Sequence, residues 1–291
     1  MDPKKAENRA TILMTVDVED WFQVENLREA CPTEKWDVYE LRVVQNTEML
    51  LDLFEKHQVR ATFFVLGWVA ERCPGLVLEI RDRGHEVASH GYQHRLCTDL
   101  SAEELRADLL RSKRVIENIT GEPVVGYRAP SFSITKETLD IVAACGYRYD
   151  SSFNNVRFNK RYGRIDSVDL SPSSNGIFIS GQGLIELPIN NLKVGPLVLP
   201  WGGGGYFRLY PTWLFTWGAS HLCSGGKPFV LYLHPWEIDT AQPRVEAISR
   251  LSRFRHYHNI HNNLRKIHQF LSRFAQDRFI SCRDLCGVSS S

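Results

Sequence analysis

The amino-acid sequence predicts an α/β fold built on a mostly parallel sheet. Strand-like and helix-like segments alternate along the chain, and several of the strand-like segments are followed directly by polar residues. The chain has 291 residues, of which 43% are hydrophobic, and this is enough to fill a sizeable core. The length suits one large domain or two small ones.

The predicted strands are short apolar runs rich in β-branched and aromatic residues. They lie at residues 11–16, 59–66, 124–127, 184–189 and 229–233. The carboxyl ends of parallel strands meet at one edge of an α/β sheet, where such folds place their active sites. The polar residues directly after these runs are therefore the first candidates for function.

The predicted helices show apolar residues at helical spacing or clear start and stop signals. They lie at residues 44–57, 73–83, 101–120, 135–145 and 262–274. Ser101 and Glu104 form a capping-box pattern at the start of the third helix, and Gly121 follows its end. Residues 151–183 show no regular pattern, and we expect an extended surface segment there.

The composition excludes several classes of protein. With 35 Lys and Arg against 34 Asp and Glu, the formal net charge is +1, which argues against a basic surface for nucleic acid. No apolar run is long enough to span a bilayer, and no apolar stretch follows the charged N-terminus as in a secretory signal. We therefore predict a cytoplasmic protein, or one held peripherally at the inner face of the membrane. The seven cysteines are scattered without a CxxC pair, which indicates reduced thiols.

Three carboxylates lie within four residues after the first predicted strand, at Asp17, Glu19 and Asp20. Such a cluster is costly unless solvent or a cation offsets its charge. Taken alone, a solvated acidic turn explains it as well as a functional site does.

Two histidines, His90 and His94, follow the short apolar stretch at 87–88. On a helical turn, residues at i and i+4 share one face, so both imidazoles could reach one metal ion. A lone pair with this spacing is more often coincidence. Together with a carboxylate from 17–20, however, the pair would make a site of two histidines and one carboxylate, with open positions for water and substrate.

Arg128 and His234 occupy two further strand ends. Arg128 stands two residues before Pro130, which restricts Ala129 to extended geometry, so the arginine has a defined direction and could pair with a carboxylate. His234 follows the strand at 229–233 and titrates near neutral pH, as suits a general acid. The ordinary alternatives are a surface arginine and a buried structural histidine.

These motifs together carry a resemblance. They are DVED at 17–20, SHGYQH at 89–94, RAP at 128–130 and LHP at 233–235. In this order the sequence resembles the polysaccharide deacetylase family with its NodB homology domain, and the resemblance spans residues 12–285. The sequence segments ATFFVLG at 61–67 and GHEVASHG at 84–91 strengthen this resemblance.

The C-terminal part resembles the subgroup of this family associated with bacterial exopolysaccharide export and exosortase loci. The matching text is GGGYFRL at 203–209, HPWEID at 234–239 and RFRHY at 253–257. The resemblance implies a distorted (β/α) barrel with fewer than eight strands, formed by a single domain at 11–285 between short tails at 1–10 and 286–291. The subgroup-specific elaboration would occupy about 190–285.

The resemblance also implies a divalent metal, most simply Zn²⁺, as cofactor. His90 and His94 match the two histidine ligands of the family. The third ligand is either Asp20 or Glu19, because the family has two adjacent aspartates and the second acid is displaced here. We favour Asp20, since a short carboxylate is the family's usual choice.

Catalytic roles follow from the same match. Asp17 matches the catalytic base, Arg128 the arginine that pairs with the base, and His234 the general acid that protonates the departing sugar amine. The expected activity is the removal of N-acetyl groups from a polysaccharide or oligosaccharide that contains amino sugars, with release of acetate. Two alternatives stay open: hydrolysis of small cyclic amides on the same fold, and glycan binding without catalysis.

Aromatic residues near these motifs could contact the apolar faces of sugar rings. Trp21, Tyr206 and Trp236 are the expected substrate-binding residues, with core packing as the alternative. The glycine run at 202–205 lacks the Lys-Ser/Thr of a phosphate-binding loop, and more simply lets the backbone approach substrate or another segment closely.

Overall fold

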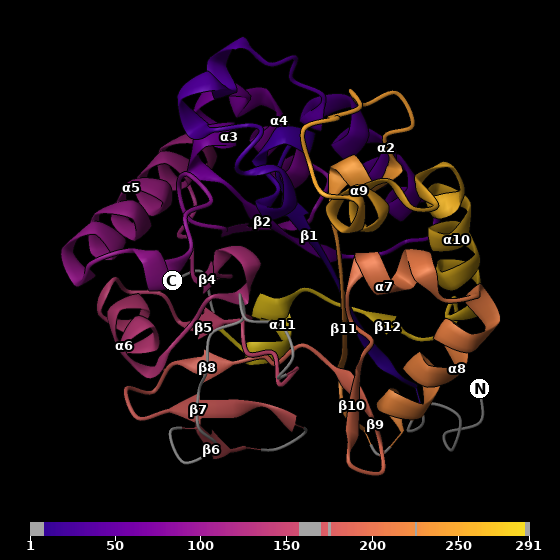
Figure 1. The fold of residues 1–291 in the computed structure, drawn as a ribbon. Coiled ribbons are helices and arrows are strands. Elements are labelled where there is room, and N and C mark those ends of the chain that lie inside the picture. Colours follow the sequence, from indigo (N-terminus) through magenta and orange to yellow (C-terminus); the bar gives the residue numbers. More distant parts are fainter. Residues whose placement is uncertain (1–8, 157–169, 174–175, 225, 289–291) are drawn as a thin grey trace.

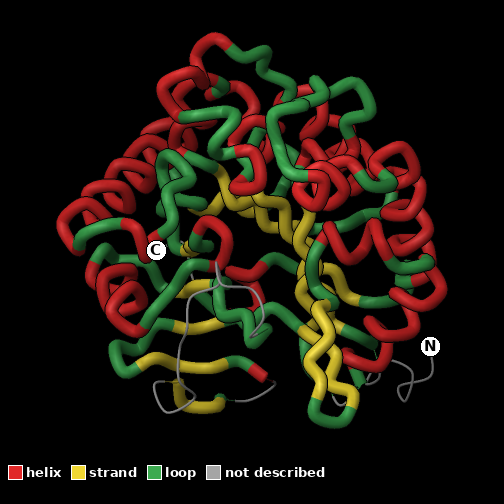
Figure 2. Tube along the Cα trace, viewed as in Figure 1, coloured by secondary structure: helices red, strands yellow, loops and turns green. Residues whose placement is uncertain are grey.

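A sheet to which the described residues contribute ten strands forms the centre of the molecule. The computed structural model describes residues 9–156, 170–173, 176–224 and 226–288. Within this part of the chain, the helices lie around the outside of the strands (Figures 1 and 2). The arrangement confirms the predicted α/β fold class.

Most strands of the sheet are parallel neighbours. These are β1 (Thr11–Val18), β2 (Ala61–Val65), β3 (Glu86–Ser89), β4 (Gly126–Tyr127), β5 (Tyr149–Asp150), β8 (Ile185–Glu186) and β11 (Phe229–Leu233). Their order in space is β11-β1-β2-β3-β4-β5-β8, and each of these seven strands runs parallel to its neighbours on this path.

The remaining strands lie at the margins. β7 (Phe178–Ser180) and β6 (Leu170–Pro172) extend the sheet in antiparallel fashion beyond β8, and β12 (Arg278–Phe279) pairs with the start of β1. β9 (Asn191–Val194) and β10 (Leu197–Pro200) form a separate antiparallel hairpin.

The helices cover the strands on the outside. They are α2 (Val43–Lys56), α3 (Gly67–Arg72), α4 (Pro74–Asp82), α5 (Ala102–Thr120), α6 (Lys136–Ala144), α7 (Gly204–Leu209), α8 (Thr212–Cys223), α9 (Arg250–Tyr257), α10 (Ile260–Arg273) and α11 (Cys282–Cys286). None of these helices combines the length and the apolar character that crossing a bilayer would need.

Most predicted elements are present, with differences at their ends. The capping box of Ser101 and Glu104 forms at the start of α5, and Gly121 ends that helix in the left-handed conformation. Helix α3, which the sequence pattern does not predict, precedes α4, which begins at Pro74. The expectation of an extended surface segment at 151–183 is wrong at its start, because Ser151 and Ser152 are fully buried. Residues 157–169 and 174–175 of that segment lie outside the described residues.

Strand β1 positions several residues of the candidate site. Residues 12–18 are all buried, as expected for a strand covered on both faces. In the sheet, Val16 lies opposite Leu233 of β11, and Asp17 lies opposite Phe64 of β2. The carboxyl ends of the three strands therefore meet, and they bring polar residues distant in sequence to one edge.

Candidate active site

A buried ion pair joins the ends of β1 and β4. Arg128 Nη1 donates a hydrogen bond of 2.7 Å to Asp17 Oδ1, and both residues are almost completely inaccessible to solvent. Burial alone would raise the pKa of Asp17, but Arg128, His90 and His234 together lower it below its usual range. The carboxyl group is therefore held ionised, as a proton acceptor must be.

Arg128 is fixed from several sides. Its guanidinium also donates to Thr15 Oγ1 at 2.8 Å, to Ser151 O at 2.9 Å and to Ser151 Oγ at 2.9 Å. Its central carbon lies 4.2 Å from the centre of the Phe64 ring. The sequence gives no signal for Thr15, which lies inside an apolar strand, and the polar run that contains Ser151 follows no predicted strand.

Three potential metal ligands converge beside this pair. One ligand atom each from Glu19, His90 and His94 lies within 4.8 Å of the others, and all three residues are buried. Glu19 Oε2 has no hydrogen-bond partner among the described residues although it is buried, and it lies 3.4 Å from His94 Nε2. An unsatisfied carboxylate oxygen facing two imidazoles suits a divalent cation that takes nitrogen and oxygen ligands.

The two histidines are suited to metal binding. Burial lowers the pKa of both to about 4, so the imidazoles are neutral at physiological pH, as ligands must be. His90 Nδ1 lies 2.8 Å from the carbonyl oxygen of Arg128, which fixes the ring and directs Nε2 toward the cluster.

The two histidines converge by a different geometry from the one predicted. Residues 90–96 form no helical turn. Instead, Gly91 and His94 adopt left-handed conformations with φ of 74° and 53°. Asp108 Oδ2 accepts a hydrogen bond of 2.8 Å from the amide of Tyr92 and so anchors the loop to α5. The spacing identifies the two residues, but a bent loop brings them together.

The structure corrects the preference for Asp20 as the third ligand. The Asp20 carboxylate accepts hydrogen bonds from the amides of Trp21 at 2.8 Å, Arg42 at 2.7 Å and Val43 at 2.9 Å. Both of its oxygens are therefore used to cap the turn after β1 and the start of α2. Of the two candidates, Glu19 is the one that belongs to the cluster with His90 and His94.

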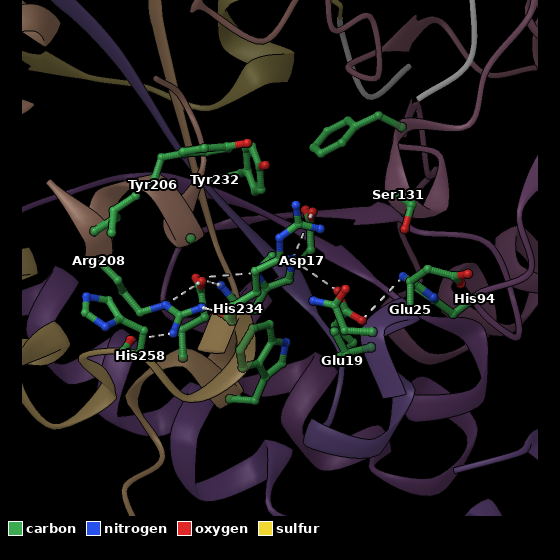
Figure 3. A pocket seen from close by; sticks show the side chains of 18 of the residues that line it. Asp17, Glu19, Glu25, His94, Ser131, Tyr206, Arg208, Tyr232, His234 and His258 are labelled. Carbon is green, nitrogen blue, oxygen red and sulfur yellow. Dashed lines mark hydrogen bonds and ion pairs between the residues drawn. The ribbon is translucent and has the colours of Figure 1, made fainter. Parts of the chain in front are cut away.

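His234 lies among three carboxylates at the end of β11. Its Nε2 is 3.1 Å from Glu19 Oε1 and 3.9 Å from Asp17 Oδ2, and its Nδ1 is 3.3 Å from Glu237 Oε2 (Figure 3). Burial disfavours the charged ring, but Glu19 and Glu237 outweigh this effect and raise the pKa of His234 to about 10. A protonated histidine can act as an acid.

These groups line a pocket of about 540 Å³. Asp17, Glu19, His234 and both cluster histidines contribute to it, and so do the predicted aromatic residues Tyr206 and Trp236. Trp236 also stacks on His234, with ring centres 5.2 Å apart. The volume is within the range of small-molecule and sugar-sized sites.

The expectation that Trp21 binds substrate is not supported. Trp21 is 4% exposed, does not line the pocket and packs against Phe22 and Tyr39. Its indole nitrogen donates to the carbonyl oxygen of Glu40. Adjacency to Asp20 in the sequence is misleading here, because the short helix η1 (Trp21–Gln23) turns the ring into the core.

The fold and this site define a class: α/β barrel-like proteins with a candidate two-histidine, one-carboxylate metal centre beside a base–arginine pair. The family model "Polysaccharide deacetylase" matches residues 31–149, and the model "Domain of unknown function (DUF3473)" matches residues 151–286. Residues 31–149 are therefore similar to the polysaccharide deacetylases.

Curated proteins show the same similarity. A peptidoglycan deacetylase of Helicobacter pylori is 34% identical over 116 residues, 40% of each chain. A peptidoglycan deacetylase-like protein of Gibberella zeae is 27% identical over 260 residues, which are 79% of this chain and 76% of the relative. A peptidoglycan-N-acetylglucosamine deacetylase of Bacillus cereus is 29% identical over 47% of this chain and 54% of its own length. The match thus spans only about half or less of two of these relatives.

Solved structures share the fold at low identity. A Mycobacterium smegmatis protein assigned to the polysaccharide deacetylases has a TM-score of 0.62 and 18% identity, over 96% of this chain and 90% of its own. A CE4 family pseudoenzyme of Bacillus anthracis has a TM-score of 0.53 and 14% identity, over 96% and 66%. Because a pseudoenzyme shares the fold, activity has to be argued from the site itself.

Proposed function

We propose that this protein is a metal-dependent hydrolase that removes N-acetyl groups from an amino-sugar-containing glycan. One observation carries the proposal: a base held by an arginine, a cluster of three metal-ligand side chains and a histidine between carboxylates all meet at one pocket. Four separate strand ends contribute these groups. A protein that had lost catalysis would have no need to keep all of them.

Glu19, His90 and His94 would hold the metal. Zn²⁺ fits the set of two imidazoles and one carboxylate, and it leaves positions open for water and substrate. When bound there, the metal would act as a Lewis acid on the acetyl carbonyl and would make an attacking water more acidic.

The side chains of the chain itself account for the proton transfers. Asp17, kept ionised by Arg128, accepts the proton of the attacking water while the water oxygen bonds to the acetyl carbon. His234 donates a proton to the nitrogen as the C–N bond breaks. The products are acetate and a free amine on the sugar. Each positioned proton-transfer group contributes typically about 10²- to 10⁴-fold to such a rate.

The substrate class rests on the resemblance and the relatives. The pocket combines charged groups with the rings of Tyr206, Tyr232 and Trp236, which suits sugar rings with apolar faces. The names of the relatives refer to peptidoglycan, and the sequence text of 203–257 resembles the exopolysaccharide-associated subgroup. We propose an N-acetylated polysaccharide or oligosaccharide as substrate.

Acetate release from N-acetylglucosamine oligosaccharides tests the proposal. We expect release that stops after complete removal of metal with a chelator and returns on addition of Zn²⁺. The variant His94→Ala should lose activity, whereas His261→Ala, at an exposed histidine far along the chain, should not. Activity that survives both metal removal and His94→Ala would contradict the proposal.

The same assay separates the two alternatives. Hydrolysis of cyclic imides or ureides but not of glycans would favour the amidohydrolase alternative. Metal-bound protein that binds glycan without turnover would favour the non-catalytic one.

A further inference from the structure

In the C-terminal half of the chain, buried charged side chains contact one another in sequence from Arg208 through Glu237 to His234. We infer that Glu237 is a positioning residue for His234, and that Arg208 of α7 holds Glu237 in place. This inference rests on the proposed deacetylase function and extends it. The segment that matches a domain of unknown function would thereby supply the acid of the reaction and fix its geometry.

Glu237 faces His234 at close range. Its Oε2 accepts a hydrogen bond of 3.0 Å from the His234 amide and lies 3.3 Å from the ring nitrogen Nδ1. Glu237 is 1% exposed, and the buried Nδ1 of His234 makes no hydrogen bond among the described residues, so its contact with Glu237 is an ion pair. A carboxylate at this nitrogen keeps a proton on Nδ1 and turns Nε2 toward the pocket, which is the atom that must deliver the proton.

Arg208 neutralises and orients Glu237. Its Nε donates to Glu237 Oε1 at 3.1 Å, so the two carboxylate oxygens are divided between the arginine and the histidine. Burial would raise the pKa of Glu237, but Arg208 and His234 lower it below its usual value. Arg208 itself is 2% exposed, which removes the freedom of a surface side chain.

The other end of Arg208 is anchored to backbone. Its two terminal nitrogens donate to carbonyl oxygens at the end of α9, namely those of Arg255 at 2.9 Å, His256 at 2.8 Å and His258 at 2.7 Å. The last carbonyls of a helix lack partners within the helix, so they are natural acceptors for a guanidinium. Arg208 therefore ties helix α9 to the residue that contacts the acid.

Two further residues hold α7 against this group. Lys266 of α10 donates to the carbonyl oxygens of Phe207 and Tyr210, at 2.5 and 2.6 Å, and thereby caps the end of α7. At the start of α7, a Cβ on Gly204 would overlap Glu237 Oε2. Only glycine lets the start of α7 approach the Glu237 carboxylate so closely. This contact explains why part of the run at 202–205 is glycine.

A purely structural ion pair is the competing explanation, and the leaving group of the substrate distinguishes the two. An acetamide expels a basic amine that needs a proton from His234, whereas 4-nitrophenyl acetate expels a weakly basic phenolate that does not. A residue that positions the acid should matter for the first substrate and much less for the second. A residue that only supports the fold should affect both alike.

The main test is therefore Glu237→Gln, which keeps size and removes charge. On the N-acetylated oligosaccharide we expect kcat to fall by about 10- to 100-fold, less than the about 10²- to 10⁴-fold for loss of the acid itself, because His234 is retained. On 4-nitrophenyl acetate we expect kcat to change by less than about threefold, with Zn²⁺ content retained, because this leaving group needs no proton. Equal losses on both substrates, or a loss below about twofold on the oligosaccharide, would overturn the inference.

Gly204→Ala is an independent second variant, because its methyl group displaces the Glu237 carboxylate without altering any charge. It should show the same split between the two substrates, and it decides the question if Glu237→Gln does not fold.

Asp239→Asn is the matched control. Asp239 is a buried acid two residues after Glu237. Its Oδ2 lies 2.5 Å from Arg42 Nε, and it does not contact His234. It should leave the ratio of the two activities unchanged. If the wild-type protein releases no acetate from any glycan, the proposed function fails instead.

Discussion

Arg128 and Asp17 form an ion pair at 2.7 Å with neither side chain appreciably exposed to water. The pair joins strands that are separated by more than one hundred residues in sequence. Buried charges of this kind contribute little to stability as a pair, but removal of one partner leaves the other uncompensated. The pair is therefore both part of the proposed catalytic machinery and a weak point of the fold.

Replacement of Arg128 by Met should be strongly destabilising. We expect a loss of about 3–5 kcal/mol in the free energy of unfolding, because Asp17 would remain buried without its cation. Arg28→Met is the control, since Arg28 pairs with Asp99 at the surface and should cost about 0–1 kcal/mol. Urea unfolding curves followed by circular dichroism measure both. Similar losses for the two variants would contradict this assignment of the Arg128 pair.

Replacement of Asp17 by Asn should abolish most activity with little loss of metal. Asparagine cannot accept the proton of the attacking water, so kcat for acetate release should fall by about 10²- to 10⁴-fold. Metal content, measured by atomic emission, should stay near that of the wild type because Asp17 is outside the cluster of three ligands. Asp140→Asn, at a partly exposed acid on α6, serves as the control. A fully active Asp17→Asn protein would refute the role of Asp17 as base.

The variants Glu19→Gln and Asp20→Ala should separate metal binding from stability. Glu19→Gln should weaken Zn²⁺ binding by more than about 100-fold, the upper range for residues that only support a ligand. Asp20→Ala should leave Zn²⁺ affinity within a few-fold and cost about 1–3 kcal/mol, because buried amides lose their acceptor. Titration calorimetry and thermal unfolding provide the two readouts. The reverse pattern would restore Asp20 as the ligand.

Two aromatic residues that look alike in the sequence should behave differently. Trp21→Ala should destabilise the protein by about 3–5 kcal/mol, since the ring fills the core. Tyr206→Ala should raise KM for the oligosaccharide and leave the free energy of unfolding within about 1 kcal/mol, since the ring lines the pocket. Michaelis kinetics and denaturant unfolding test both. A Tyr206 variant with unchanged KM would remove Tyr206 from the substrate site.

His85 should make stability depend on pH below neutrality. Burial, assisted by Arg60 and Arg83, lowers the pKa of His85 from 6.5 to about 4, and its Nδ1 accepts a hydrogen bond from the amide of Ala61. The unfolded chain therefore binds a proton between pH 6.5 and 4 that the folded protein does not bind. Stability should be unaffected above pH 6.5 and should fall as pH drops toward 4, by up to about 3 kcal/mol from this group.

The variant His85→Gln should flatten this dependence, because the amide can accept the same hydrogen bond without titrating. Urea unfolding at about pH 7.5, 6 and 5 measures the slope. His261→Gln, at an exposed histidine, should leave the slope as in the wild type. A slope that is the same in the His85 variant and the wild type would show that other groups cause the acid sensitivity.

The sequence is sufficient to predict the fold class and most residues of the candidate site, because both predictions depend on local sequence patterns. Strand ends followed by His90, Arg128 and His234 can be recognised without knowing how the sheet is assembled. The choice between Glu19 and Asp20 cannot be made in this way. It depends on the amides of Arg42 and Val43, which reach Asp20 from the start of α2 and occupy its carboxylate.

The support of His234 escapes sequence inspection for a similar reason. Glu237 stands three residues after the histidine, and this spacing is a usable signal for a side chain that folds back onto the preceding backbone. Arg208, in contrast, is 29 residues from Glu237 and 47 to 50 residues from its backbone partners. No local sequence pattern predicts contacts between residues so far apart in the chain.

The position of β11 beside β1 has a consequence for biosynthesis. Strand β1 is made first and β11 more than two hundred residues later, yet the two are neighbours in register. Until the ribosome has released residues 229–233, one edge of the hydrophobic strand β1 lacks its partner and is open to pairing with other chains. Nascent chains that stop short of this strand should be recognised by chaperones or aggregate, and these chains also lack His234 and with it a complete candidate site.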